Sequence, residues 1–348
     1  MMSRNTCLRS FYSLLLLALP LLLTSTVQAA PNGQPFQQLQ NQVDQLYLNT
    51  TSDPIEVTVN CPGDSINDVL SEYGGIAAPL IITINGICNE VVLIQRDDVT
   101  LRGATSSDGI TLTAPAFPGV GTSPGTNRTV IENMTLNFIA GFGILCNDSS
   151  ITINNVTINH TGIGIAAVNN GRCLVTGSTI DGNGSGTGIM AGLLGSLQLG
   201  SSIVRNNYTG IYVHSNGDAF LGDFSGAMTT IENNTYGVRV YNGGNVNLVN
   251  TDVTNNGTGI ELLPNTTLAI NANLVPGSAG GFIHDNTGIG VIFHQNTSVI
   301  NFNGAFNIQN NGGYGITCEP SVVFVGVSPT LSGNNSGGAQ YLNCSFPP

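Results

Sequence analysis

The chain has 348 residues, of which 45 are glycine, none is tryptophan and only 8% are charged. Its eight basic residues are all arginine, and 20 aspartate and glutamate residues outnumber them. An acidic chain without lysine has no basic surface for binding nucleic acid or an anionic membrane by counterion release, which argues against both partners.

The first 29 residues have the features of a secretory signal peptide. Arg4 and Arg9 precede an apolar run at 11–23, and Ala29 follows Val27 by two positions, a spacing typical of a cleavage site. Cleavage after Ala29 leaves six arginines against 20 acidic residues, a net charge near −14 (6 minus 20). No other long apolar run follows, so we expect a secreted or periplasmic protein whose mature form does not insert into a membrane.

Two short helices are predicted near the N-terminus. Residues 30–54 form an amphipathic appendage, in which Phe36, Leu39, Val43 and Leu46 fall at helical spacing. This appendage would pack on the rest of the chain or self-associate. A second helix is predicted between the capping residues 64–65 and the glycines at 74–75, and we expect it to cover the N-terminal end of the domain that follows.

A short phrase, Asn-Asn-x-x-Gly-Ile-x-Val, recurs between about residues 133 and 344. Its clearest copies lie at 206–213, 233–240 and 255–262. Successive glycines of all the copies are 21, 24, 22, 27, 22, 31, 25 and 23 residues apart: Gly143, Gly164, Gly188, Gly210, Gly237, Gly259, Gly290, Gly315 and Gly338. A repeat of this length that carries strand signals indicates a solenoid.

The residues after each glycine alternate as a half-buried strand requires. Ile211 and Val213 would face inward, and Tyr212 between them would face outward. Glycine permits the backbone angles of a sharp corner, and asparagine tolerates the left-handed region while its amide bonds the neighbouring backbone. Stacked coils would place these amides in one column, each bonded to the next. The pattern therefore predicts a parallel β-helix.

The repeat resembles the right-handed parallel β-helix of the pectate-lyase-like superfamily, which includes pectate lyases, polygalacturonases and alginate C5-epimerases. The resemblance covers roughly residues 55–344. It implies an all-β fold over residues 55–348, a single-stranded right-handed parallel β-helix (a solenoid) with short N-terminal capping helices, in which each coil stacks only on its neighbours. The phrase is specific for the fold and carries little information about the reaction.

Loops are predicted where the rhythm of the repeat breaks. Residues 55–60 alternate as the first strand, and the phrases at 82–86 and 99–103 belong to the first coils. Residues 104–128, rich in Gly, Pro, Ser and Thr, are predicted to form one long loop. Extra length also occurs around 215–230 and 264–284. Long loops on a solenoid are either functional or covering insertions.

Six cysteines remain after removal of the signal peptide, and an even number in an exported protein indicates disulfides. Fifteen connectivities are formally open. We favour pairing in sequence order, because the separations of 27, 27 and 26 residues each span about one coil: Cys61–Cys88, Cys146–Cys173 and Cys318–Cys344. The second pair stacks less simply, because Cys146 lies three residues after its glycine and Cys173 lies nine after its own.

Most catalytic patterns of the superfamily are missing from the chain. A polygalacturonase-like site would need further Asp, Gly-His-Gly and basic motifs beyond the isolated Asn250-Thr251-Asp252. Calcium-dependent pectate lyases use several outward Asp ligands and a nearby basic residue, and no such column of Asp occurs at the strand positions of the repeat. The chain has no other metal, phosphate or nucleophile motif, so no cofactor is predicted and calcium is not indicated.

One phrase is similar to the Tyr-Gly-x-Asp-Pro-His motif of alginate C5-epimerases. The run at 209–214, Thr-Gly-Ile-Tyr-Val-His, places His214 at the position of the catalytic histidine. The resemblance implies an acid or base role for His214, but the Tyr, Asp and Pro of the motif are replaced by Thr209, Tyr212 and Val213. His294 stands at the same place in a later copy that lacks the rest of the motif.

The outward positions of three consecutive coils predict a cluster at the same place. Positions two and four after each glycine give Tyr212 and His214, then Arg239 and Tyr241, then Glu261. Side chains in each column would lie about 5 Å apart. Abstraction of a proton beside a sugar carboxylate needs a cation to stabilise the developing charge and a His or Tyr as base and acid. We therefore predict His214, Arg239, Tyr212 and Glu261 as catalytic residues.

The longer coil between Gly210 and Gly237 adds two carboxylates to this cluster. Asp218 and Asp223 are expected in a loop that walls the groove, and Asp218 with Tyr241 would bind substrate. The alternative is an ordinary surface on which Arg239 and Glu261 form an exposed ion pair worth under roughly 1 kcal/mol.

Other titratable residues are assigned structural roles. His160 and His284 are expected near corners of the coils, and three glutamates stand without a visible partner: Glu90, Glu232 and Glu319.

The functional interpretation is an exported β-helix protein that binds or processes a polysaccharide, as a uronate lyase or a C5-epimerase-like enzyme. The alternative is a noncatalytic glycan-binding, adhesive or structural extracellular solenoid. The partner is a polysaccharide or cell-surface glycan, and outward tyrosines, with Tyr208 as a further member, would stack on its sugar rings. The acidic charge disfavours polyanionic glycans unless a local arginine or bridging cation compensates.

Overall fold

The computed structural model describes residues 53–113, 118–222, 227–270, 282–302, 307–326, 329–335 and 339–346. Residues 54–348 form one compact unit. The predicted signal peptide and the amphipathic appendage lie outside the described residues, as do Asp223 and the glycine at 338.

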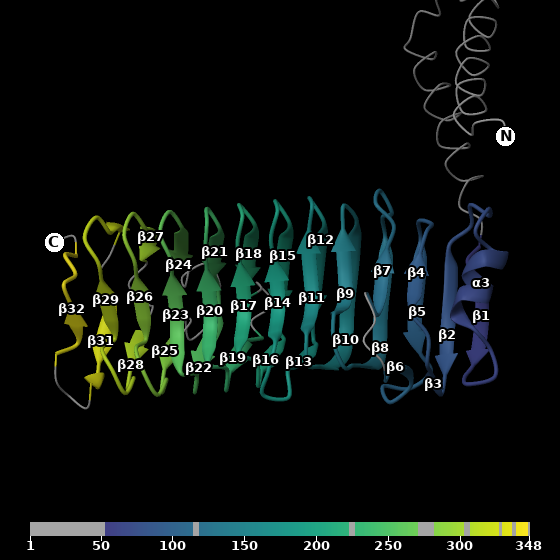
Figure 1. Ribbon diagram of the computed structural model, residues 1–348, viewed down its shortest axis with the longest axis horizontal. Coiled ribbons are helices and arrows are strands. Elements are labelled where there is room, and N and C mark those ends of the chain that lie inside the picture. The colour runs from purple at the N-terminus through teal and green to yellow at the C-terminus, as the bar shows by residue number, and fades with distance from the viewer. Residues whose placement is uncertain are drawn as a thin grey trace, which may run out of the picture. The chain divides into compact units, whose positions relative to one another are not determined.

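The described chain is an all-β parallel solenoid of about eleven coils, and strand pairing is parallel throughout. The strands stack side by side along one axis, from β1 at one end to β32 at the other (Figure 1). The predicted right-handed parallel β-helix is thereby confirmed as the fold. One sheet has eleven strands: β4 Val92–Ile94, β7 Val120–Thr122, β9 Phe142–Asn147, β11 Ile163–Val168, β14 Thr187–Ala191, β17 Thr209–Val213, β20 Tyr236–Val240, β23 Thr258–Leu262, β26 Val291–Phe293, β29 Ile316–Cys318 and β32 Tyr341–Leu342.

The second sheet has 21 strands and supplies two faces of each coil. Its first face contains β1 Ile55–Asn60, β2 Leu80–Asn85, β5 Val99–Gly103, β12 Arg172–Thr176, β15 Ser196–Gly200, β18 Asp218–Leu221, β21 Asn245–Leu248, β24 Thr267–Ile270, β27 Ser298–Phe302 and β30 Val323–Gly326. Its second face contains β3 Ile87–Cys88, β6 Gly109–Leu112, β13 Thr179–Asp181, β16 Ile203–Arg205, β19 Thr229–Glu232, β22 Thr251–Thr254, β25 Phe282–His284, β28 Asn307–Gln309 and β31 Thr330–Ser332. The long strands β8 Thr129–Phe138 and β10 Ser150–His160 run through both faces and join them.

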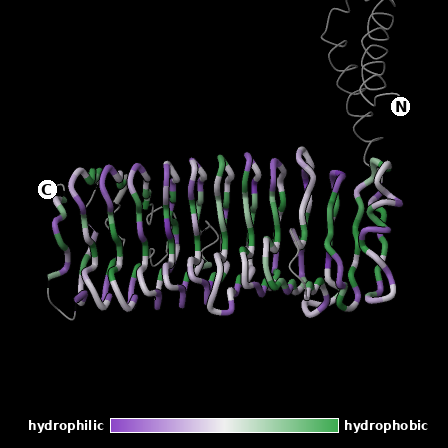
Figure 2. The backbone as a smooth tube through the Cα atoms, in the orientation of Figure 1, coloured by the Kyte–Doolittle hydropathy of each residue, from purple (hydrophilic) through white to green (hydrophobic). Residues whose placement is uncertain are grey.

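Alternation along each strand creates the core. In β17 Ile211 and Val213 are fully buried, whereas Tyr212 between them faces outward. Hydrophobic and hydrophilic positions alternate in this way along the stacked coils (Figure 2). Because equivalent residues of successive coils pair in register, the inward side chains form continuous columns of Ile, Val and Leu.

The predicted asparagine column exists at the corner before the eleven-stranded sheet. The first asparagine of each copy has a left-handed backbone, with φ of 56° at Asn206. The second is buried, and its amide nitrogen donates to the amide oxygen of the next coil, over 2.9 Å between Asn207 and Asn234. The Oδ1 atom of Asn234 also accepts the backbone N–H of Asn207, and the same arrangement satisfies a buried donor at each corner. The ladder continues at 2.8–3.1 Å through Asn256, Asn286, Asn311 and Asn334.

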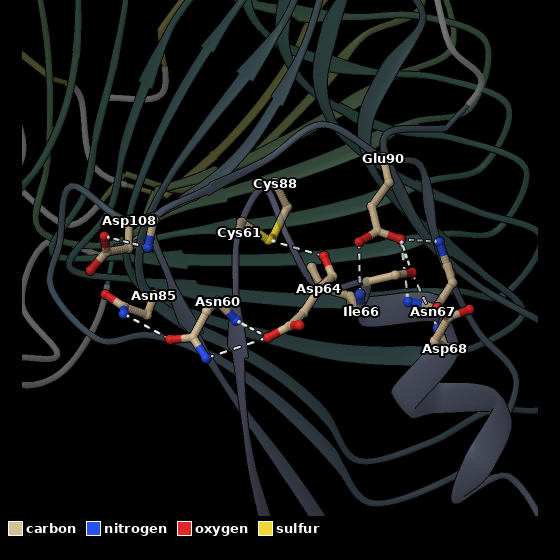
Figure 3. Close-up of a disulfide and its surroundings, with 12 residues drawn as sticks. Asn60, Cys61, Asp64, Ile66, Asn67, Asp68, Asn85, Cys88, Glu90 and Asp108 are labelled. Carbon is tan, nitrogen blue, oxygen red and sulfur yellow. Dashed lines mark hydrogen bonds between the residues drawn. A yellow bond between two sulfur atoms is a disulfide. The ribbon is translucent and has the colours of Figure 1, made fainter.

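The predicted capping helix is α3, Ile66–Glu72, with Ser65 as N-cap. Ile66 and Leu70 are buried against the first coils, so the helix covers core at the N-terminal end (Figure 1). Glu90 is not without a partner, as the sequence suggested. Its carboxylate accepts the backbone N–H of Ile66 at 2.7 Å and the hydroxyl of Ser65 at 2.9 Å, so it caps the positive end of the helix (Figure 3).

The three expected disulfides are present. Cys61–Cys88 lies beside the capping helix (Figure 3), and Cys318–Cys344 ties β29 to the C-terminal segment. Cys146–Cys173 connects β9 with β12, so it crosses the buried interior between the two sheets. The irregular spacing of this second pair has this origin, because the two cysteines belong to different sheets.

The prediction of one long loop at 104–128 is wrong. The segment contains β6 and β7, which continue both sheets, and Val120 is fully buried. Because Gly and Pro interrupt the alternation of apolar and polar residues here, the period-2 pattern does not reveal these short strands. The other two regions of extra length, 215–230 and 264–284, each include residues outside the described ones, at 223–226 and 271–281. No helix among the described residues is long and apolar enough to cross a bilayer.

Candidate functional site

The predicted outward residues lie in one row across three adjacent strands. Tyr212 of β17 pairs in register with Arg239 of β20, and Arg239 pairs with Glu261 of β23. The row is on the outer face of the eleven-stranded sheet, because its neighbours in each strand are buried. The continuous parallel register of the coils thus brings together residues separated by 27 and 22 positions.

Arg239 is held by a carboxylate and by an aromatic ring. Its Nε donates to Glu261 Oε2 at 2.6 Å, and its guanidinium carbon lies 4.5 Å from the centre of the Tyr236 ring. Tyr236 in turn meets Tyr208 edge to face, with ring centres 5.6 Å apart. Burial lowers the pKa of Arg239, but the hydrogen bond and charge of Glu261 together with the nearby tyrosines outweigh burial, so the net pKa is raised. Arg239 is therefore a permanent, immobilised cation.

The row extends beyond Glu261 to the next two coils. His294 Nε2 contacts Glu261 Oε1 at 3.2 Å, and His294 Nδ1 contacts Glu319 Oε1 at 2.9 Å. Glu319 also accepts the backbone N–H of Gln295, and its pKa is lowered, first by the hydrogen bond from His294. Glu319, expected to lack a partner, is thus one end of a chain that runs from Arg239 through Glu261 and His294.

His214 lies beside Tyr212 on the same outer face. The two rings stack with centres 4.9 Å apart and planes inclined by 24°. His214 Nδ1 contacts the hydroxyl of Ser215 at 3.0 Å, and the ring covers Gly192, where any larger residue would collide with it. Burial lowers the pKa of His214. The imidazole is therefore neutral near pH 7 and retains a nitrogen that can accept a proton.

The structure separates the two expected substrate-binding residues. Tyr241 directly follows β20, a central strand of the eleven-stranded sheet, and is 46% exposed. Asp218 is not in a loop: it begins β18 on the other sheet, where Asn245 donates to it at 2.9 Å. There it lines a hollow of about 330 Å³ on the outer side of that sheet, together with Phe220 and Asn247. The interpretation of Asp218 as a loop residue is wrong because the turn after His214 is short and the strand starts at once.

Sequence reasoning missed Tyr236 as a member of this site and left out His294 and Glu319. Tyr236 precedes its glycine, whereas only positions after the glycine were considered. His294 and Glu319 lie four residues after Gly290 and Gly315, so the rule that selected His214 would have found them in later coils. We call Tyr208, Tyr212, His214, Tyr236 and Tyr241 the aromatic patch.

The remaining histidines have distinct surroundings. His160 ends β10 with its ring in the core, 1% exposed, and neither ring nitrogen has a hydrogen-bond partner among the described residues. His284 lies on the second face of the large sheet, where its Nε2 contacts Asp252 at 2.9 Å and its Nδ1 contacts Asp285 at 2.6 Å. Burial raises the pKa of Asp252 despite the nearby imidazole. His284 therefore belongs to an outward acid–base group and not simply to a corner.

The described residues contain no group of three or more His, Cys, Asp or Glu side chains placed to hold a metal ion. The chemistry available at the candidate site is stacking by aromatic rings, hydrogen bonding by phenols and carboxylates, and proton transfer by His214.

Comparison with known proteins identifies the fold. No family profile and no curated protein sequence matches the chain. The periplasmic alginate epimerase AlgG has a similar structure, with a TM-score of 0.56 and 13% identity over 84% of each chain. A point mutant of that epimerase gives a TM-score of 0.50 and 14% identity over 84% of each chain. An alginate lyase from Paenibacillus sp. str. FPU-7 is more distant, with a TM-score of 0.39 and 12% identity over 85% of this chain and 99% of the lyase. At these identities the likeness to the epimerase shows the β-helix fold alone.

Proposed function

We propose that the protein is an exported β-helix that binds a polysaccharide along the outer face of its eleven-stranded sheet. The observation that carries this proposal is the aromatic patch. Its rings lie on adjacent coils, and Tyr208 and Tyr241 are 50% and 46% exposed. Aromatic faces with hydroxyl groups at their edges suit sugars, which present both C–H faces and hydroxyls.

Two further observations support an extracellular or periplasmic role on glycans. The three disulfides are typical of a protein that folds in an oxidising compartment. The structural neighbour of similar fold is named as a periplasmic alginate epimerase, so this fold carries polysaccharide chemistry in at least one other protein.

The proposal is tested by affinity electrophoresis and calorimetry of the purified protein against a panel of soluble polysaccharides. For any polysaccharide that binds, Tyr241→Ala and Tyr212→Ala should each weaken binding by about 2- to 10-fold. This range corresponds to roughly 0.5–1.5 kcal/mol for a lost aromatic contact. Arg172→Ala, on the other sheet, is the control for a surface substitution.

Unchanged affinity in both tyrosine variants would place the binding surface elsewhere. The absence of binding to every polysaccharide tested would leave a structural or adhesive solenoid as the function.

A second candidate is catalytic processing of the glycan at His214, as a lyase or C5-epimerase-like enzyme. The observation that favours it is the partly buried, neutral imidazole stacked on Tyr212, which pairs a base with a phenol on one face. Incubation with uronate polymers should then produce ultraviolet absorbance from unsaturated ends, or a change in C5 configuration measured by NMR. His214→Gln should abolish either signal, whereas polysaccharide binding should weaken by no more than the roughly 2- to 10-fold expected for the loss of one ring of the patch.

A further inference from the structure

We propose that the glycan bound at the aromatic patch is electrically neutral and is not a polyuronate. This inference rests on the proposed function and names the substrate class of the same surface. It departs from the substrate in the name of the structural neighbour and argues against the uronate polymers of the second candidate function. The argument follows from where the positive charge of the chain lies.

The mature chain has six positive side chains available at neutral pH besides histidine, and the structure describes all of them. Four are bound to carboxylates: Arg102 to Glu132, Arg128 to Asp97 and Asp98, Arg205 to Asp181, and Arg239 to Glu261. Arg96 is buried and donates to backbone carbonyls of the N-terminal cap. Among the exposed arginines that the structure describes, only Arg172 has no carboxylate within salt-bridge distance, and it lies on the other sheet.

The charge at the patch is balanced or negative. Arg239 is the sole arginine there, and Glu261 neutralises it across 2.6 Å. Beyond it, His294 lies between Glu261 and Glu319. The formal charges of Arg239, Glu261, His294 and Glu319 sum to zero when His294 carries a proton and to −1 when it does not. An anionic sugar would therefore have to compete for Arg239 with the carboxylate of Glu261, which is already bound to it and only 12% exposed.

The long-range field acts in the same direction. A mature chain with a net charge near −14 repels a polyanion at distances below the Debye length, about 10 Å at 0.1 M salt. A neutral chain of sugars experiences neither effect. It needs only ring faces and hydroxyl partners, which the tyrosines of the patch and the neighbouring exposed carboxylate of Glu319 supply.

The test compares neutral polysaccharides (galactomannan, xyloglucan and dextran) with polyuronates (alginate and polygalacturonate) at 20 mM and 300 mM NaCl. We expect the wild-type protein to bind at least one neutral polymer with an affinity that changes less than 2-fold between the two salt concentrations. Polyuronates should bind at least 10-fold more weakly. Binding of a polyuronate that is tighter than every neutral polymer and weakens with salt would overturn the inference while leaving the proposed function intact.

A gain of function makes the test sharper. Glu261→Gln removes the carboxylate that neutralises Arg239, so this variant should bind polyuronates at least 5-fold more tightly than wild type, and only at low salt. Glu132→Gln is the matched control, because it frees Arg102 from an ion pair of the same 2.6 Å length away from the patch. An equal gain in both variants, or no gain in Glu261→Gln, would refute the argument from local neutralisation. Failure of the wild type to bind any polysaccharide would instead refute the proposed function.

Discussion

Acid should destabilise this β-helix through one buried histidine. His160 is 1% exposed and its ring nitrogens have no partner among the described residues, so burial lowers its pKa from the ordinary 6.5 to about 4. The unfolded chain binds a proton near pH 6.5 and the folded chain does not, so the free energy of unfolding falls as the pH drops from 6.5 to 4. The contribution is fully present above pH 6.5 and lost below pH 4. A difference of about 2.5 pH units corresponds to about 3 kcal/mol.

The variant that isolates this effect is His160→Phe. Phe138 occupies the equivalent position of the preceding coil, so the core already accommodates this side chain in the neighbouring layer. Urea unfolding followed by circular dichroism between pH 4 and 7.5 gives the free energy of unfolding of both proteins. The wild type should lose about 3 kcal/mol more than the variant across this range.

Ile158→Val, two residues earlier on the same strand, serves as control. It should lower stability by about 0.5–1.5 kcal/mol at every pH without changing the pH dependence. If wild type and His160→Phe give parallel curves, the buried imidazole is not the acid-sensitive group and the reasoning fails.

Three further predictions concern what holds the coils together. Asn256→Ala should destabilise the protein by about 3 kcal/mol or more in urea unfolding, because it removes the acceptor of the buried backbone N–H of Asn234; an effect below 1 kcal/mol would contradict the importance of the ladder. Glu90→Gln should cost about 1–3 kcal/mol and expose the amide protons of α3 to faster hydrogen exchange, whereas unchanged protection there would show that the cap is dispensable. Replacing Cys146 and Cys173 together by alanine should cost about 2–5 kcal/mol, and equal thermal midpoints for variant and wild type would contradict this.

The repeat determined most of what could be predicted. A period-2 pattern after each Gly fixed which of Ile211, Tyr212 and Val213 face inward, and the asparagines fixed the corner, because both signals are local and recur in every coil. The row from Tyr212 to Glu261 followed directly, since each of those three coils carries a clear copy of the repeat phrase, which marks the register.

What sequence could not reveal depended on diagonal contacts between coils and on contacts outside the repeat. The contact between His294 and Glu261 is diagonal, because Glu261 pairs in register with Ile292, and the repeat predicts only partners in the same column. Glu90 binds Ile66, which lies 24 residues earlier in a helix that is not part of the repeat. The period of the repeat cannot predict such a partner. Asp218 was misplaced because a turn-rich composition conceals a four-residue strand.

The asparagine ladder also gives the molecule a direction. Every amide from Asn207 to Asn311 donates toward the C-terminus, and the last one, Asn334, donates to the amide oxygen of Gln340. The amide dipoles are therefore aligned head to tail over six coils, and each polarises the next. A coil inserted anywhere within this run would accept from one neighbour and donate to the other, leaving no new unmatched polar group. The length of the solenoid can thus change by duplication of whole coils, whereas a partial coil would interrupt the line of dipoles and leave buried amide groups without partners.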